Sequence, residues 1–172
     1  MNVSQIIEAN DGNLDGINLS GKNLSEANLR GVSLRRANLK RANLQNANLK
    51  DADLSGANLA QANLQQAVLA RANLKNAYLQ RASLQGAVLA QASLRGADLT
   101  GADLTNATFI GTDMTRATLR GAVVSERDLR CGCGLSSAIM PDGAQMPVQP
   151  GEGQSPGEAT SPSTSLKPAQ SK

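Results

Sequence analysis

The sequence has no histidine and no tryptophan, and among its 172 residues it has only one tyrosine, Tyr78, and one phenylalanine, Phe109. Aromatic side chains normally supply much of a compact core, so this chain must bury apolar surface in another way. Histidine is the commonest general base and the commonest metal ligand. Its absence excludes Ser-His-Asp and Cys-His catalytic sets. We therefore predict that the protein is not an enzyme and binds no cofactor.

Cysteine is scarce as well, because Cys131 and Cys133 are the only two. A structural zinc site needs four ligands, so we interpret this pair as ordinary residues near the end of the folded region. A metal or redox role is the alternative. No apolar run reaches the length of a signal peptide core or of a membrane span. These absences predict a soluble, cytoplasmic protein that does not insert into a membrane.

What the sequence does have is a repeat of five residues. Leucine recurs at every fifth position from Leu14 to Leu104, and the series continues with Phe109 and other apolar residues to Leu129. Alanine stands two positions before each of these centres with few exceptions, among them Val32 and Thr112. Asparagine, aspartate or serine usually lies between the alanine and the centre. Such a fixed period indicates a repeat architecture.

A period of five suits neither a helix nor a flat strand. On an α-helix, successive leucines would be rotated by about 140° and would spread around the cylinder. On a strand they would alternate between the two faces. The leucines share one interior only if the backbone turns a corner every five residues. Asparagine and aspartate suit such corners, because their side chains hydrogen-bond to nearby backbone groups.

The number of sides in a coil follows from a second spacing. The segment AVLARA at residues 67–72 returns as AVLAQA at residues 87–92, which is an offset of 20. Four repeats per coil would stack these segments about 4.8 Å apart, whereas three repeats would not align them. Runs such as ANLKRANL at residues 37–44 resemble the pentapeptide-repeat family, and the resemblance covers about 70% of the chain. It implies an all-β solenoid, a right-handed four-sided (quadrilateral) β-helix, as in cyanobacterial-type members.

The composition divides the chain into four parts. Residues 1–11 are predicted to hold a short N-terminal capping helix, residues 12–131 the pentapeptide-repeat β-helix, and residues 132–143 a C-terminal cap. Residues 144–172 are rich in proline, glycine and serine, which predicts a disordered tail. The inward pattern weakens at both ends, at Ile17 and Lys22 and at Arg127. Lys22 is tolerable there only if its chain extends out of the first coil.

Aspartate precedes the centre in several repeats, at Asp53, Asp98, Asp103 and Asp113. Acid–base catalysis is one interpretation, but asparagine fills the same position in most other repeats. We therefore expect these carboxylates to accept hydrogen bonds from the turns.

Two groups of outward residues are candidate binding sites. The first is a candidate partner-binding basic face, which is either a docking site for an anionic partner or a set of solubilising charges: Arg30, Arg35, Arg36, Lys40, Arg41 and Lys50. The second is a candidate apolar interface, which is either a contact for a partner or a second copy, or incidental surface: Val68, Val88, Ala70, Ala90 and Ile110.

The sequence therefore favours a non-catalytic structural or interaction protein whose flat solenoid faces bind another macromolecule. A protein partner is the first expectation. Nucleic acid is weaker, because no aromatic residues interleave the basic ones, and a homodimer is a further alternative. Family resemblance adds a DNA-mimicking protein that protects gyrase. Residues 12–131 hold 15 lysines and arginines against 9 aspartates and glutamates, a net charge of +6, which is the wrong sign for imitating phosphates.

Overall fold

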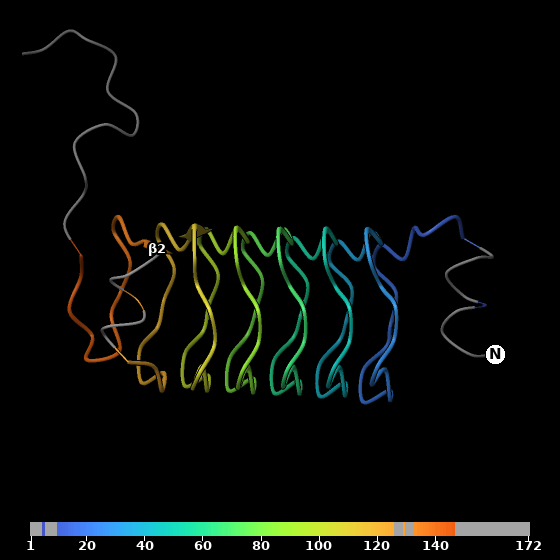
Figure 1. Cartoon of the computed structure of the whole chain (residues 1–172), viewed down its shortest axis with the longest axis horizontal. Helices are drawn as coiled ribbons and strands as arrows, with labels where there is room; N and C mark the ends of the chain where they lie inside the picture. Colours follow the sequence, from blue (N-terminus) through green and yellow to red (C-terminus); the bar gives the residue numbers. More distant parts are fainter. Residues whose placement is uncertain (1–4, 6–9, 126–128, 130–132, 147–172) are drawn as a thin grey trace, which may run out of the picture.

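The structure, a computed structural model, describes residues 5, 10–125, 129 and 133–146. The backbone forms a row of stacked coils that follow one another along the long axis of the molecule (Figure 1). The bridges between neighbouring coils from residue 13 to residue 123 are parallel and join residues that are 20 apart, such as Asn13 with Ser33 and Val68 with Val88. With a corner every five residues, each coil has four sides, which confirms the prediction from the repeated segment.

Each corner is a tight turn that begins at the leucine of the repeat. At one of them the N–H of Ala37 donates to the carbonyl of Leu34 at 3.1 Å. Arg36, the third residue of this turn, has a φ of 55°, as a type II turn requires. Left-handed backbone costs a non-glycine residue roughly 1–2 kcal/mol, and most corners use one at this position. The corners therefore depend on stabilisation from elsewhere in the fold.

Backbone hydrogen bonds between coils supply that stabilisation. The N–H of Leu34 donates to the carbonyl of Asp53 at 2.7 Å, and the N–H of Asp53 donates to the carbonyl of Val32 at 3.0 Å. The turn takes part as well, because the N–H of Arg36 donates to the carbonyl of Ser55 at 2.9 Å. The same pattern repeats along the rod, so each coil fixes the corners of the coil before it.

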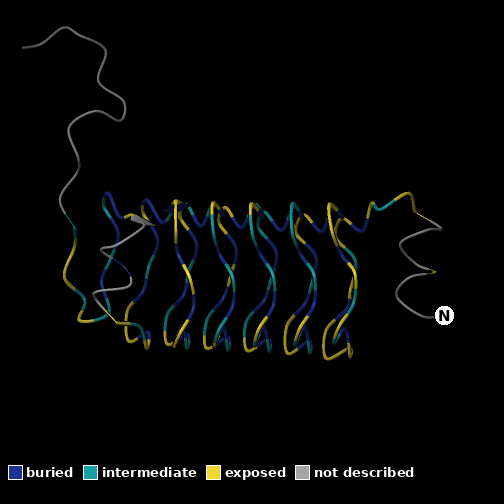
Figure 2. Cartoon of the chain, viewed as in Figure 1, coloured by how far each residue is buried: buried dark blue, intermediate teal, exposed yellow. Residues whose placement is uncertain are grey.

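The core is a ladder of leucine with alanine beside it. Every leucine from Leu14 to Leu104 is buried, and the alanines two positions earlier are buried from Ala37 onward. Figure 2 shows the buried positions recurring around every coil. Thr112 replaces one alanine and is also buried, with its hydroxyl donating to the carbonyl of Leu89 at 2.8 Å. Because burying one leucine side chain contributes about 1.5–3 kcal/mol, this ladder is the main source of stability.

The asparagines before the leucines do not lie at the corners, where the sequence was expected to place them. They occupy the bridge positions at the middle of each side, while the leucine and the two residues after it form the turn. Their predicted hydrogen bonding is confirmed, since Oδ1 of Asn38 accepts the N–H of Lys40 at 3.2 Å. Side-chain amides also link coils, as from Nδ2 of Asn38 to Oδ1 of Asn18 at 3.1 Å. Asparagine therefore stabilises the turn that follows it and also links neighbouring coils.

The coil continues beyond residue 131 with a change of register. Strand β1 (Thr112–Asp113) pairs in parallel with strand β2 (Cys133–Gly134), an offset of 21 residues. The buried Leu129 and Leu135 are accordingly six residues apart. The parallel ladder extends to Ile139, which bridges to Thr118. One additional residue thus enters the last coil without interrupting the core.

The chain then folds back on this last coil. Gly143, with a φ of 87°, reverses the direction of the chain, and Ile139 pairs with Gln145 in antiparallel register. The N–H of Met146 donates to the carbonyl of Ala138 at 2.8 Å. Residues 144–146, which the composition assigns to the tail, are therefore paired, because the glycine turn brings their backbone against the edge of the coil.

At the N-terminal end Ile17 is partly buried, and Lys22 is exposed, as expected for a lysine whose chain leaves the core. Of the predicted N-terminal helix only Gln5 belongs to the described residues. Arg127 and residues 147–172 lie outside them as well. The capping helix, the disordered tail and the right-handed sense of the coil stay predictions.

Replacing Leu64, which is fully buried in the middle of the rod, with alanine is expected to lower the free energy of unfolding by about 2–5 kcal/mol, through lost burial and the cavity left behind. The outward Gln65→Ala is the matched control and is expected to change it by less than about 0.5 kcal/mol. Urea denaturation followed by circular dichroism measures both. Equal effects of the two substitutions would contradict the role of the leucine ladder.

Candidate functional site

The carboxylates of the repeats act as hydrogen-bond acceptors for the turns. Oδ1 of Asp98 accepts the N–H of Thr100 at 2.9 Å, and Asp103 accepts the N–H of Thr105 at 3.0 Å. Burial acts to raise the pKa of Asp98, but the hydrogen bonds from Thr100 and Gln80 outweigh it and the pKa is lowered. Hydrogen bonds from Thr105 likewise lower the pKa of Asp103. A general acid needs a pKa near the working pH, so these groups suit structure rather than proton transfer.

The described residues contain no group of three or more histidine, cysteine, aspartate or glutamate side chains able to hold a metal ion. Cys131 lies outside these residues, and the backbone of Cys133 belongs to β2. The described part of the chain also contains no helix that is long and apolar enough to cross a membrane.

The six predicted basic residues do not lie on one face. Hydrogen bonds between coils place residues 20 apart in the same column, as from the N–H of Gly31 to the carbonyl of Lys50 at 2.9 Å. Arg30 and Lys50 thus share one corner, while the pairs 35–36 and 40–41 occupy the next two corners of a single coil. We name these three positions the basic corners. They surround two sides of the rod near its N-terminal end.

Several basic side chains are paired with a carboxylate one coil away, and one is hydrogen-bonded to a neutral side chain there. The guanidinium of Arg35 lies 2.7 Å from the carboxylate of Asp15, and its Nε donates to the same group at 2.8 Å. Asp51 lies 3.6 Å from Arg30 and also binds Arg71 in the next coil. Nε of Arg41 donates to Oε1 of Gln61 at 2.8 Å. Charge within a column therefore removes part of the basic potential that the sequence suggests.

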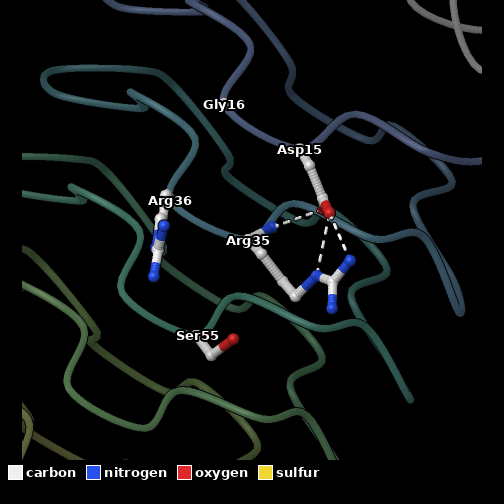
Figure 3. Close-up of a pocket in the computed structure, with 5 residues that line it drawn as sticks. All are labelled: Asp15, Gly16, Arg35, Arg36 and Ser55. Atoms are coloured by element: carbon white, nitrogen blue, oxygen red, sulfur yellow. Dashed lines mark hydrogen bonds and ion pairs between the residues drawn. The ribbon is translucent and has the colours of Figure 1, made fainter.

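Four of the six basic residues have no acidic partner among the described residues: Arg36, Lys40, Arg41 and Lys50. Figure 3 shows the side chain of Arg36 standing apart from the Asp15–Arg35 pair. Of these residues, Arg36 lines a surface hollow of about 540 Å³, together with Asp15, Gly16, Arg35 and Ser55.

A second hollow adjoins the first along the same corner. Its volume is about 650 Å³, and Arg36 and Ser55 line both hollows. The further lining residues are Gly56, Asn73, Lys75, Asn76 and Tyr78. Sequence reasoning did not find this hollow. A size comparison down the column would have found it, because Ser55 and Gly56 separate larger residues 20 positions before and after them.

The predicted apolar interface is mostly covered. Val68 and Val88 stack as expected, since they bridge in parallel, but both are half-buried, as are Ala70 and Ala90. Only Ile110 is strongly exposed, at 73%. The stripe therefore offers much less apolar surface than its sequence suggests.

The chain matches the family profile described as pentapeptide repeats over residues 13–51, 47–86 and 82–121. No curated protein matches it. Among solved structures, it is 28% identical to HetL, a pentapeptide repeat protein involved in heterocyst differentiation regulation from the cyanobacterium Nostoc sp. strain PCC 7120, with a TM-score of 0.56 and 78% of each chain covered.

Two other solved structures align with the chain. AT2G44920, from the thylakoid lumen of Arabidopsis thaliana, is 29% identical with a TM-score of 0.45, and the alignment covers 67% of this chain and 71% of that one. QnrB1, a plasmid-mediated fluoroquinolone resistance protein, is 18% identical with a TM-score of 0.46, and the alignment covers 74% and 77%.

Arg35→Gln is expected to raise the pKa of the Asp15 carboxyl, because hydrogen bonds from Arg35 are the largest cause of its lowering from 3.8 to about 2. A lowered pKa stabilises the fold above pH 3.8, and this contribution disappears as the pH falls from 3.8 to about 2. Carboxyl carbon chemical shifts, followed by NMR against pH, measure the pKa in both proteins. Arg81→Gln is the control, and an unchanged Asp15 pKa in Arg35→Gln would contradict the pairing.

Proposed function

Because the chain belongs to the pentapeptide-repeat family, whose members are generally non-catalytic structural or interaction proteins, we propose that it is a docking rod that binds an acidic protein partner through its basic corners. The observation that carries the proposal is the unpaired charge of Arg36, Lys40 and Lys50 on three neighbouring corners. The docking surface is Arg30, Arg35, Arg36, Lys40, Arg41 and Lys50. A cytoplasmic location is part of the proposal.

The rigidity of the rod supports this function. Corners locked by hydrogen bonds on both sides hold the outward side chains in straight columns, so little order has to be gained on binding. Long-range attraction from a positive surface also accelerates the approach of an acidic partner. HetL, which resembles this chain in sequence and fold, is involved in heterocyst differentiation regulation, and such a role is compatible with a protein that acts by contact.

Other binding modes are less well supported. Gyrase protection by DNA mimicry requires a strongly acidic rod, whereas residues 12–131 carry 15 basic against 9 acidic side chains, a net charge of +6. Nucleic acid as the partner would favour stacking residues among the cations, and Tyr78 is the only tyrosine of the chain. A homodimer through Val68, Val88, Ala70, Ala90 and Ile110 would bury little apolar surface, because most of that stripe is already covered.

Affinity capture from a lysate of the source organism tests the docking surface. The bait is the full chain, and the variant is Arg35→Glu/Arg36→Glu/Lys40→Glu/Arg41→Glu. The control, Lys22→Glu/Arg81→Glu/Arg116→Glu/Arg120→Glu, changes the net charge equally on other parts of the rod. We expect a partner that the native chain and the control retain, and that the variant binds at least about tenfold more weakly, because each desolvated charge pair is worth more than 1 kcal/mol.

The captured protein is then purified and its affinity measured directly by calorimetry, with circular dichroism to confirm that all three rods are folded. Equal affinity for the native chain and the variant would contradict the proposal. An enzymatic activity abolished by one substitution would contradict it as well.

A further inference from the structure

One corner of the rod contains a notch formed by small side chains between large ones. The N–H of Arg36 donates to the carbonyl of Ser55, and the N–H of Gly56 donates to the carbonyl of Lys75, each at 2.9 Å. These bonds stack three successive coils at this corner. Because serine and glycine are much smaller than their neighbours, the middle coil is recessed, which produces the hollow of about 650 Å³. We call it the Ser55–Gly56 notch.

The walls of the notch are positively charged. Arg36 extends over the recessed coil, since its Cγ lies 3.4 Å from the position that a Cβ on Gly56 would occupy. Lys75 lines the opposite wall. Neither makes an ion pair within the described residues. Two cations therefore face one recess, and no acidic side chain is among the described residues that line it.

The nearby carboxylates are occupied elsewhere. Asp15 is bound by Arg35. Asp53, on the adjoining side, accepts the N–H of Ser55 at 3.0 Å and Nδ2 of Asn73 at 2.9 Å. Both carboxylates are engaged by residues of their own coil or of the next one, so Arg36 and Lys75 remain available to an external acceptor.

The other residues that line the notch suit a hydrogen-bond acceptor that is attached to an apolar carbon chain. The hydroxyl of Ser55 is a hydrogen-bond donor. Tyr78 is 52% exposed and adds an apolar ring with a hydroxyl. The side chain of Asn76 lies toward the following coil, with Oδ1 2.5 Å from the place of a Cβ on Gly96, so it bounds the notch instead of filling it.

We propose that the Ser55–Gly56 notch anchors a single carboxylate side chain of an acidic segment in the partner protein. The inference rests on the proposed docking function and specifies its chemistry. The guanidinium of Arg36 binds the carboxylate in the bidentate manner that its geometry favours, and the ammonium of Lys75 supplies the second charge. The ring of Tyr78 packs against the adjacent methylene groups of the bound residue.

A carboxylate fits the notch better than a nucleic acid backbone does. Nucleic acids gain affinity from many phosphate contacts made along a continuous basic track. This corner instead alternates in charge, because Asp15 neutralises Arg35, and Asp113 lies 3.2 Å from Arg95. Two convergent cations around one recess are suited to one small anion.

Binding of a fluorescein-labelled octaglutamate peptide, measured by anisotropy, tests the notch in the full chain. Arg36→Gln/Lys75→Gln is expected to weaken binding by about tenfold or more, because it removes two charge-assisted contacts. The matched control is Arg81→Gln/Arg120→Gln, which is expected to change affinity by less than about threefold through general screening.

The control is close in structure. Arg81 has a φ of 56°, against 55° for Arg36, and its Cγ lies 3.5 Å from the place of a Cβ on Gly101, yet it lines neither hollow. Glutamine is tolerated at this turn position, since Gln61 and Gln91 occupy it with φ of 60° and 59°. Both double variants should therefore fold, which circular dichroism confirms.

A blocking variant gives a second measurement. Ser55→Glu introduces a carboxylate that competes from within the notch, and we expect it to reduce peptide binding about as strongly as Arg36→Gln/Lys75→Gln does. Asp15 occupies the equivalent corner position 40 residues earlier in the column, so an acidic residue fits there. Gln65→Glu, with the acidic residue on another corner, is its control and should bind the peptide nearly as well as the native chain.

The outcomes separate this inference from the proposed function. Equal losses in the two double variants would overturn the notch, while the capture experiment decides the docking function independently of the peptide. The proposal for the notch would also be overturned if Ser55→Glu bound the peptide as well as the native chain does. It would be overturned too if the native chain bound an equally charged DNA duplex but did not bind the peptide.

Discussion

The constraint on which the whole structure depends is the turn that the backbone makes after every leucine. Arg36 illustrates it, because an arginine is held there in left-handed backbone that it would ordinarily avoid. Hydrogen bonds from the coils on either side hold the corner in this conformation. Once the corner is fixed, the leucine must point inward, the next two residues must point outward, and every residue must lie beside the residue 20 positions away.

Straight columns also determine the character of the surface. A side chain on this rod has its nearest outward neighbours in its own column, so charge and size are decided by residues 20 apart. Asp15 cancels Arg35 in this way, and Ser55 and Gly56 leave a recess below Arg36. The basic corners therefore differ from one another, although in the sequence they look like a uniform cluster. In the proposed docking function, these local differences between corners determine binding specificity.

The inward positions and the sides of the coils are used for packing and for hydrogen bonds within the rod. Positions inside the coil admit leucine and alanine, or an occasional residue such as Thr112 that bonds to the backbone. Aspartates on the sides are engaged by the turns, which lowers the pKa of Asp98 and Asp103. The proposed docking function uses the corner residues, whose side chains take part neither in the core nor in the bridges between coils.

The sequence by itself determined the repeat, the four-sided coil and the buried leucines, because a period of five and an offset of 20 admit one regular solution. It also identified which residues point outward. Only the tertiary structure decided that the asparagines lie on the sides, that the register changes by one residue between Val123 and Cys133, and that Arg35 is paired with a carboxylate while Arg36 is not. Those features depend on contacts between neighbouring coils. The shape and charge of each neighbouring residue decide them, and the five-residue period of the sequence does not reveal them.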